Sequence, residues 1–485
     1  MRRYIVEMSL QAVRPEGEQT VRSYEDLQHD LHRDTRFSYD MRWSLRRISA
    51  VWAAKITEKI SIHIFRRQGA AWAGKIALKI CPSILHELAG QVGRGIFAVC
   101  GTNGKTTVNN LLCAAIEAEG YRVVCNHTGS NMLNGIASAF AACAGLDGNL
   151  KADYACIEID EASAGRVIRH FRPDYMVLTN LFRDQLDRYG EIDTAMKILG
   201  RVMRQAPEMK VVVNGDEPLS AFLAMDSGNP YITYGIHDPV RACDHSREIR
   251  EGRFCRRCGT GLDYHFYHYS QLGDYYCPKC GFQRPGLQFN ACDIEFGKEL
   301  TFTVEDKRIH SAHKGFYNIY NILAAYAALR TAGLGGKHFA RVAGSYEPEN
   351  GRMEEFWIGG VRVMLNLAKN PAGFNQNIDV VMQDENIKDL LIVINDNDQD
   401  GRDISWLWDV DFERLKRTAT GSVMVSGLRC SDMMLRMKYA GIDSEIEADV
   451  RKAVKRSVRE GCGNLYVLVN YTALYDIRNI LRNCR

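Results

Sequence analysis

The 485-residue chain lacks any apolar run of the roughly 18–20 residues that a membrane-spanning helix needs. Its first residues lead into a polar stretch without the apolar core of a signal peptide. It also lacks an excess of either charge, because 62 Lys and Arg face 59 Asp and Glu, for a formal net charge of +3. These absences argue against a membrane-spanning helix, leave no electrostatic drive toward nucleic acid, and make the cytoplasm the expected compartment.

Fifteen cysteines are present, but disulfide frameworks belong to short secreted chains, so most of these residues are expected to be free thiols. Hydrophobic residues make up 46% and charged residues 25% of the chain, which is typical of a globular protein. A chain of this length exceeds what one hydrophobic core supports, and we expect two or three domains.

Residues 1–40 are polar and weakly periodic, and they read as an extension of unknown role. Met41, a hypothetical translation start, opens a basic helical pattern with apolar residues at Trp43, Ile48, Trp52, Ile56, Ile60 and Ile64. Such a helix could lie on a membrane surface. We favour a helix packed on the next domain, because aromatic and aliphatic stripes usually face a core.

Short apolar runs alternate with helical patterns through most of the remaining chain. The runs expected to be buried strands are 96–99, 154–159, 175–178, 211–213, 361–365, 390–394, 423–425 and 466–469. This alternation predicts an α/β protein with parallel-rich sheets that helices cover on both faces. A polar break near 347–351 suggests a linker. We therefore expect one domain over 41–345, interrupted by an insertion at 250–285, and a second, Rossmann-like α/β domain over 346–485.

A glycine-rich turn with a Lys-Thr pair follows the first of these strands and precedes a helix. Its residues are Gly101, Thr102, Asn103, Gly104, Lys105, Thr106 and Thr107. Glycines let the backbone wrap a phosphate, and a helix N-terminus directs amide groups at it. Lys105 would supply a cation for the terminal phosphates and Thr106 a hydroxyl for Mg²⁺. Val99 stands where the general P-loop motif has its first glycine, yet the context predicts a nucleotide site.

The loop with its Thr-Asn insert resembles the ATP loop of the Mur ligases and folylpolyglutamate synthases. The resemblance implies a central P-loop ATPase domain of the Mur-ligase type that uses ATP and Mg²⁺. It implies that Glu158, at the end of a later strand, holds Mg²⁺, and that Asn318 and Asn321 contact the adenine. Segment 179–190 resembles the next family motif, with Gln185 where most relatives have histidine.

Two Cys-x-x-Cys knuckles lie 18 residues apart in the insertion, formed by Cys255, Cys258, Cys277 and Cys280. Two thiolates from each knuckle complete a tetrahedral site, and closed four-thiolate sites usually hold structural Zn²⁺. Iron–sulfur or redox use is the alternative. The intervening aromatic residues Tyr264, Phe266, Tyr267, Tyr269, Tyr275 and Tyr276 are expected to form a small core. A base-stacking role is weak because no basic stripe accompanies them.

Ordinary Mur ligases do not carry this zinc ribbon, which is similar to the Mur-ligase-like subunits of lipid II isoglutaminyl synthases. That resemblance implies ATP-dependent amidation of the D-glutamate α-carboxylate in the lipid II stem peptide, through an acyl phosphate, to give D-isoglutamine. It implies a heterodimer with a GatD-type class I glutamine amidotransferase that supplies ammonia, and a place at the inner face of the membrane. Lys369 stands where Mur ligases have a histidine.

An acid-rich loop, 395–406, follows the apolar run 390–394. Composition alone ranks a solvated turn first for this loop, ahead of a metal site or a catalytic carboxylate. The resemblance implies instead that one aspartate completes the amidotransferase triad by orienting its histidine. Asp403 is the predicted acid, with Asp400 and Asp398 as the other candidates.

Two other functions stay open at this point. One is a Mur or folylpolyglutamate-type ligase that joins an amino acid, instead of ammonia, to the activated carboxylate. The other is a non-enzymatic zinc-ribbon module with a regulatory nucleotide site. The intact set of Lys105, Thr106 and Glu158 argues against the second, because a purely regulatory site need not keep a magnesium carboxylate.

Overall fold

The computed structural model describes most of the chain beyond its first 44 residues. The extension 1–40, the hypothetical start at Met41 and the replacement at Gln185 lie outside the described residues. These are 45–61, 70–184, 192–241, 248, 250–297, 299–312, 315–347, 351, 353–418, 420–460 and 463–483.

The larger of two main sheets has nine strands in the order β11-β10-β9-β6-β5-β4-β1-β3-β2. Neighbours from β2 to β9 pair in parallel, whereas β9, β10 and β11 pair antiparallel. The strands are β1 (Val92–Cys100), β2 (Val123–Cys125), β3 (Ala152–Glu158), β4 (Tyr175–Leu178), β5 (Lys210–Asn214), β6 (Tyr231–Ile236), β9 (Phe289–Phe296), β10 (Leu300–Val304) and β11 (Lys307–Ser311).

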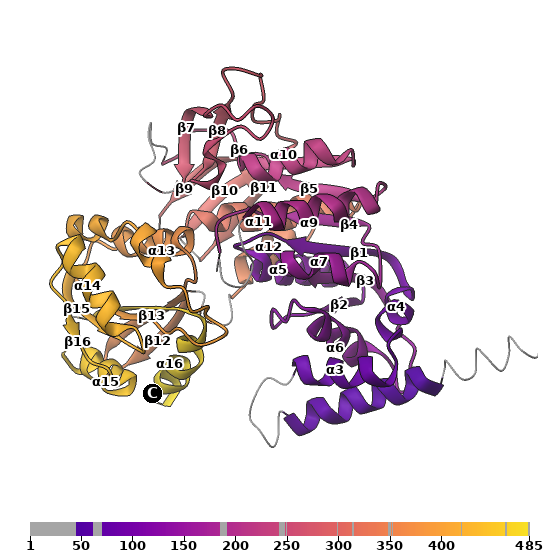
Figure 1. Cartoon of the computed structure of the whole chain (residues 1–485), viewed down its shortest axis with the longest axis horizontal. Helices are drawn as coiled ribbons and strands as arrows, with labels where there is room; N and C mark the ends of the chain where they lie inside the picture. Colours follow the sequence, from indigo (N-terminus) through magenta and orange to yellow (C-terminus); the bar gives the residue numbers. More distant parts are fainter. Residues whose placement is uncertain are drawn as a thin grey trace, which may run out of the picture.

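Helices cover both faces of this sheet (Figure 1). Alternate side chains of a strand point to opposite faces, and β1 accordingly sends Ala98 into one core and Phe97 and Val99 into another. The first core is covered by α3 (Ala70–Ile80), α4 (Ile84–Ala89), α6 (Leu133–Cys143), α7 (Glu161–Val167), α9 (Ile192–Gln205) and α10 (Pro218–Ser227). The second is covered by α5 (Lys105–Ala118), α11 (Tyr317–Thr331) and α12 (Phe339–Ser345).

Residues 45–61 form a helix that packs on the first core. The side chains that make this contact are Ala50, Val51 and Ala54, each at most 2% exposed. The expectation that the large apolar stripe faces the core is wrong, since Trp52 and Ile56 are about half exposed. Alanines allow the helix to approach closely, which leaves the bulky residues on the outer side.

The second main sheet has six strands in the order β12-β13-β17-β14-β15-β16, all parallel except the β12–β13 pair. Helices again cover both faces, so the predicted fold class is confirmed. The elements are β12 (Glu354–Ile358), β13 (Val361–Leu367), α13 (Pro371–Gln383), β14 (Lys388–Val393), η2 (Ser405–Asp409), η3 (Phe412–Arg417), β15 (Thr420–Ser426), α14 (Cys430–Ala440), β16 (Glu445–Ile446), α15 (Val450–Glu460), β17 (Asn464–Val469) and α16 (Tyr471–Asn483).

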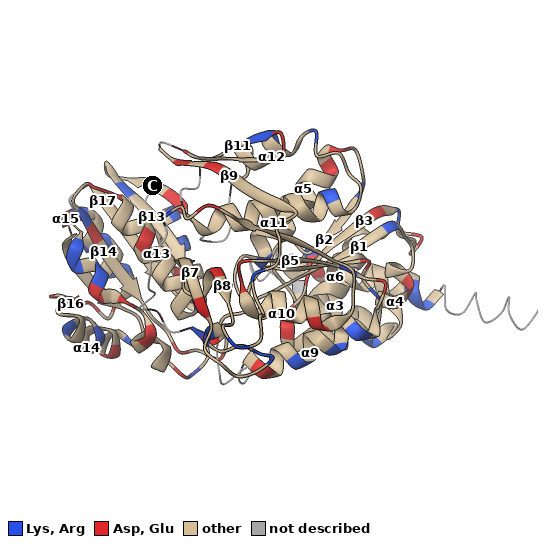
Figure 2. Cartoon of the chain, turned by 90° about the horizontal axis from the view of Figure 1, so that it is seen from above, with Lys and Arg blue, Asp and Glu red and all other residues tan. Residues whose placement is uncertain are grey.

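The insertion forms a small two-stranded ribbon, with β7 (Asp263–Tyr269) antiparallel to β8 (Leu272–Tyr276) after the short turn η1 (Glu251–Arg253). Its core combines Tyr275 and Phe282 with Leu262 and with Ala221 of α10. Tyr269 belongs to the second core of the large sheet instead, so the expected aromatic core is smaller than predicted. Figure 2 shows basic and acidic residues of both kinds on the helices and loops around the two main sheets, whose strands are mostly free of them.

Candidate functional site

The phosphate loop joins the end of β1 to the start of α5, and two of its glycines have positive φ angles. Gly101 has φ 121° and Gly104 has φ 85°. A Cβ at Gly101 would collide with the Thr179 hydroxyl, and one at Gly104 with the amide oxygen of Asn321. Only glycine combines these backbone angles with such close neighbours.

The end of β4 fixes the conformation of the loop through hydrogen bonds. The amide of Thr102 donates to the Asn180 carbonyl at 2.8 Å, and the amide of Asn103 donates to Oδ1 of Asn180 at 2.9 Å. The Thr179 hydroxyl donates to the Asn103 carbonyl at 2.8 Å. The Thr-Asn pair at the end of β4 thus fixes the backbone of the glycine-rich turn.

Lys105 is held inside the cradle by an acid that the sequence analysis did not assign. Its Nζ lies 2.6 Å from the Gly101 carbonyl and 3.1 Å from Oε1 of Glu161, which also accepts from the Gly101 amide at 2.6 Å. Burial acts to lower the pKa of Lys105, but the carboxylates of Glu161 and Glu158 outweigh it and raise that pKa, so Lys105 stays charged. The sequence feature that could have pointed to Glu161 is its position three residues after Glu158, the acid already assigned to this site.

Glu158 ends β3 directly beside the first turn of α5. Its Oε2 accepts from the Thr106 hydroxyl at 2.7 Å, and its Oε1 accepts from Nδ2 of Asn131 at 2.9 Å. Glu158 is 3% exposed. A hydroxyl and a buried carboxylate that converge next to a phosphate cradle are the oxygen ligands that Mg²⁺ uses in nucleotide sites, so these residues fit the ion.

Both asparagines predicted to contact adenine lie in the first turns of α11 and are buried. Asn321 lies against Gly104, and its Nδ2 donates to Oδ1 of Asn318 at 3.3 Å. The structure therefore places Asn321 at the phosphate loop, one helical turn from Asn318.

The second sheet reaches the phosphate loop through the start of α13. Asn103 and Asn370 exchange two amide hydrogen bonds, at 3.3 and 3.0 Å. Lys369 forms an ion pair with Asp184, Nζ to Oδ2, at 2.6 Å. The lysine that stands in the histidine position thus ties the second sheet to the loop after β4.

The acidic loop after β14 gives its carboxylates different environments. Asp400 is 4% exposed and accepts from the amide and the hydroxyl of Thr472. Asp396 pairs with Arg429 at 2.7 Å, whereas Asp398 is exposed and 3.5 Å from Arg402. A surface cavity of about 780 Å³ opens over this loop, lined by Asp396, Asn397, Asp398, Gln399, Arg402, Arg429 and Thr472.

Asp403 differs from the other acids of the loop. Its Oδ1 accepts from the amide of Ser405 at 2.8 Å, and the side chain of Ser405 is a second hydrogen-bond donor to the same carboxylate. Hydrogen bonds from Ser405 hold its pKa below the usual value, so the half-buried carboxylate is ionised at neutral pH. An ionised, partly exposed carboxylate is the kind of acceptor that a histidine N–H would require.

The four ribbon cysteines come together as predicted. Sγ of Cys255 lies 3.4 Å from Sγ of Cys280, and Sγ of Cys258 lies 3.5 Å from Sγ of Cys277. Tetrahedral thiolates around Zn²⁺ at about 2.3 Å would be about 3.8 Å apart, so the donor set fits this ion.

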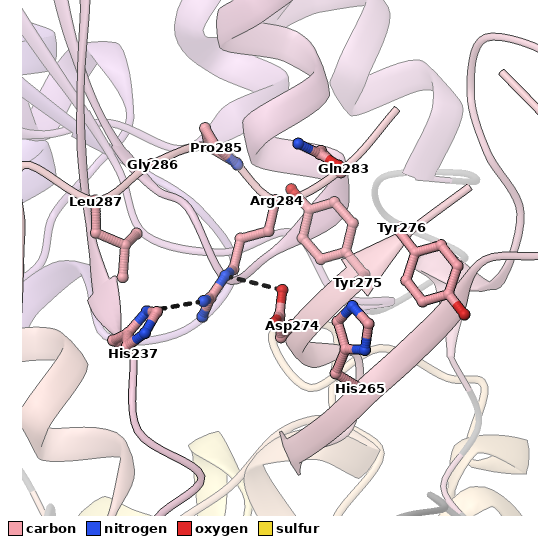
Figure 3. A pocket seen from close by; sticks show the side chains of 10 residues that line it. All are labelled: His237, His265, Asp274, Tyr275, Tyr276, Gln283, Arg284, Pro285, Gly286 and Leu287. Carbon is pink, nitrogen blue, oxygen red and sulfur yellow. Dashed lines mark hydrogen bonds and ion pairs between the residues drawn. The ribbon is translucent and has the colours of Figure 1, made fainter. Parts of the chain in front are cut away.

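A second cavity, of about 330 Å³, lies beside the ribbon (Figure 3). Arg284 crosses its floor and contacts Asp274 at 3.2 Å and His237 at 3.3 Å. Behind it, Arg284 also meets the buried Asp216, whose Oδ2 accepts from the Tyr320 hydroxyl at 2.8 Å. The ribbon is thereby coupled to α11, which carries Asn318 and Asn321.

Comparisons with known proteins show to which class of enzyme fold the chain belongs. Residues 99–276 match the Mur ligase middle domain, and residues 367–474 match the MurT ligase C-terminal domain. The fold is similar to that of a pseudomurein peptide ligase type C from Methanothermus fervidus, with a TM-score of 0.65 and 19% identity, covering 82% of this chain and 80% of that one. The chain therefore has the Mur ligase fold.

Two curated relatives narrow the class. The chain is 36% identical to the lipid II isoglutaminyl synthase (glutamine-hydrolyzing) subunit MurT of Staphylococcus aureus strain COL, over 89% of this chain and 96% of that protein. It is 32% identical to the MurT subunit of Streptococcus pneumoniae strain R6, over 80% of this chain and 87% of that protein. The chain belongs to the MurT family, which confirms the predicted ligase class. No helix in the described part of the chain could cross a membrane.

Proposed function

We propose that this chain is the ATP-dependent subunit of an enzyme that amidates the D-glutamate α-carboxylate of the lipid II stem peptide. The observation that carries the proposal is the convergence of Lys105, Thr106 and Glu158 around a rigid phosphate cradle, in a chain of the MurT family. A carboxylate is a poor acceptor for ammonia until phosphate becomes its leaving group, and the cradle supplies what such a phosphoryl transfer needs.

The phosphoryl step follows from the residues around the cradle. The amides of 101–107 and the Lys105 ammonium stabilise charge on the transferred γ-phosphoryl group. Thr106 and Glu158 would hold the magnesium ion, which when bound would neutralise charge on the phosphate oxygens. Glu161 keeps Lys105 charged and aimed along the loop. The substrate carboxylate attacks the γ-phosphorus, ADP leaves, and an acyl phosphate forms.

The amide step needs ammonia near the acyl phosphate. Ammonia attacks the acyl carbon, inorganic phosphate leaves, and the proton lost from nitrogen passes to solvent or a basic group. We propose that the chain forms a heterodimer with a GatD-type class I glutamine amidotransferase that releases this ammonia from glutamine. The two relatives are named as subunits of a glutamine-hydrolyzing synthase, which supports a partner of this kind.

Asp403 is the acid that we propose to complete the partner's triad. It is half-buried and ionised, and its hydrogen bonds come from Ser405, two residues along the same loop, whereas Asp400 is buried and Thr472 of α16 occupies both of its oxygens. An acid that orients a histidine must offer an oxygen that the histidine can reach. Asp398 is exposed and pairs with Arg402 at 3.5 Å, so it is the weaker candidate.

We further propose that the four ribbon cysteines hold a structural Zn²⁺. Asn318 and Asn321 contact the adenine of ATP. The chain has two domains, over residues 41–345 and 346–485. We also propose that the chain works at the cytoplasmic face of the membrane, where its lipid-linked substrate lies. The exposed Trp52, Ile56 and Trp72, beside basic residues of the same helices, support this placement.

The test is a reconstitution of the full chain with the amidotransferase of the same organism, Mg-ATP, glutamine and lipid II. We expect a product in which one hydroxyl is replaced by an amino group, dependent on both chains and on ATP. Phosphate release that requires an added amino acid, with no amide formed from glutamine, would show instead that the chain is an amino-acid-adding ligase.

A further inference from the structure

A second group of soft ligands lies away from the ribbon, among cysteines that the sequence analysis expected to be free thiols. Among the described residues, two groups of three or more cysteines, histidines or acids bring their ligand atoms within 4.8 Å of one another. One is the ribbon. The other consists of Cys113, Cys125 and His127.

Two elements next to the phosphate loop bring these residues together. Cys113 lies on α5, Cys125 is the last residue of β2, and His127 follows two residues later. Cys113 is hydrogen-bonded to both Cys125 and His127. Nδ2 of Asn109 donates to Sγ of Cys125 at 3.2 Å, so the group has polar as well as apolar surroundings.

The donor set matches a tetrahedral thiophilic cation. Metal–sulfur distances of about 2.3 Å and metal–nitrogen distances of about 2.0–2.1 Å place neighbouring ligand atoms about 3.3–3.8 Å apart. The ligand atoms of the three residues all lie within 4.8 Å of one another, so small rotations of the side chains bring them to these separations. The two thiols are at most 8% exposed while His127 is exposed, which gives a cation a route from solvent.

We propose that Cys113, Cys125 and His127 form a second metal site, for a thiophilic divalent cation such as Zn²⁺, with water in the fourth position. Neutral imidazole and thiolate are the ligands that such ions prefer over oxygen. The two cysteines come from different elements, so a bound ion cross-links α5 to the loop after β2.

This cross-link would act on the wall of the nucleotide site. Asn126, between the two ligands Cys125 and His127, accepts from the Glu158 amide and donates to the Glu158 carbonyl, both at 2.9 Å. Further along the loop, a Cβ at Gly129 would lie 3.2 Å from the Thr106 hydroxyl. An ion at this site therefore holds the segment 125–129 against the residues that we assign to Mg²⁺.

The experiment counts zinc in the full chain purified with its partner subunit. The complex is exposed to Zn²⁺, passed over a weak chelator, and analysed by elemental mass spectrometry. We expect two zinc ions per chain in the wild type and one in Cys113→Ser, Cys125→Ser and His127→Gln. Cys277→Ser should also keep one, because it removes the ribbon ion. Cys292→Ser, a half-buried thiol on β9, is the matched control and should keep two.

His127→Gln protects the test against misfolding, because its side chain is exposed. Substitution of cobalt for zinc in Cys277→Ser should still give a thiolate-to-cobalt charge-transfer band, which His127→Gln weakens. One zinc per chain in the wild type, unchanged by Cys113→Ser and lost with Cys277→Ser, would overturn the proposal. A Cys113–Cys125 disulfide in the zinc-treated complex, found by mass after alkylation, would overturn it too.

Discussion

The phosphate loop and the acidic loop occupy equivalent places, each at the carboxyl end of a parallel strand in its own sheet, yet they are built differently. In the first, the charged groups are buried and engage one another, with Lys105 and Glu158 at most 6% exposed. In the second, Asp398 and Arg402 are exposed, and Asp400 is the one buried residue among the charged side chains of the loop 395–406, all of which the structure describes. The first loop is complete within this chain, and the second presents an acid outward. We interpret this difference as a division of labour between a phosphoryl-transfer site and a docking site.

The largest expected effect is on amidation with glutamine as the nitrogen source, which should depend on the acidic loop, whereas amidation with ammonium should not. Asp403→Asn should lower glutamine-dependent amidation by about 10²- to 10⁴-fold, because an unoriented histidine in a triad loses that much rate. Amidation with added ammonium should stay unchanged. Asp398→Asn is the matched control in the same loop and should keep both activities. If Asp398→Asn loses the glutamine-dependent activity and Asp403→Asn keeps it, the acid is assigned to the wrong residue.

Lys105→Ala should lower amidation about 10²- to 10³-fold with either nitrogen source, the usual loss when one charge-stabilising donor is removed. Lys151→Ala, at an exposed lysine directly before β3, should leave both rates unchanged. Initial rates of phosphate release with glutamine and with ammonium measure this. If the rate fell with glutamine but not with ammonium, Lys105 would act in the partner's reaction. The two loops would then not differ in function.

Asp400 should matter for stability, because its carboxylate accepts two hydrogen bonds from Thr472. Asp400→Ala leaves the Thr472 amide without its partner, and we expect a loss of about 1–3 kcal/mol in the free energy of unfolding. Urea denaturation followed by circular dichroism measures it. Asp398→Ala should change stability by less than about 0.5 kcal/mol, as exposed sites do. Equal losses in the two variants would show that the acidic loop has no buried anchor.

The smallest effect concerns pH and the buried support of α11. Burial raises the pKa of Asp216 to about 6, despite the opposing charge of Arg284, and burial lowers the pKa of His268 to about 4. A raised acid pKa removes stability as pH rises toward 6, whereas the lowered histidine pKa adds stability as pH rises from 4 to about 6.5. The two trends oppose each other in the wild type.

Asp216→Asn removes the first trend, so the free energy of unfolding should increase more steeply between pH 4 and 6 than in the wild type. Denaturation at four or five pH values is sufficient to measure the slope. A slope that matches the wild type would mean that Asp216 titrates in the folded chain as it does in the unfolded one.

The sequence was sufficient to predict the sheets and the phosphate cradle because their signals are local. The expected strand 175–178 coincides with β4, and the glycine-rich turn lies between a strand and a helix, β1 and α5, as expected. The cysteine spacing likewise predicted which four thiols meet. In each case the residues that form the feature are close together in the chain or follow the period of a strand.

Long-range partners could not be predicted in the same way. Glu161 contacts Lys105 only because β3 and β1 are neighbours in the sheet, and the Thr472 contact of Asp400 depends on where α16 begins. The prediction that the large apolar residues of the helix over 45–61 face the core was wrong for a related reason. A stripe of large residues does not show that small alanines on another side of the helix can pack more closely. The group of Cys113, Cys125 and His127 likewise has no spacing motif.

The central claim is that phosphoryl transfer and nitrogen supply are served by separate loops of one chain. The most direct test incubates this chain alone with Mg-ATP, lipid II and an ammonium salt, and follows the product by mass. We predict that the wild type and Asp403→Asn form the amide at equal rates, while Lys105→Ala forms almost none. If Asp403→Asn is as inactive with ammonium as Lys105→Ala, the acidic loop takes part in the ligase chemistry itself and the account is contradicted.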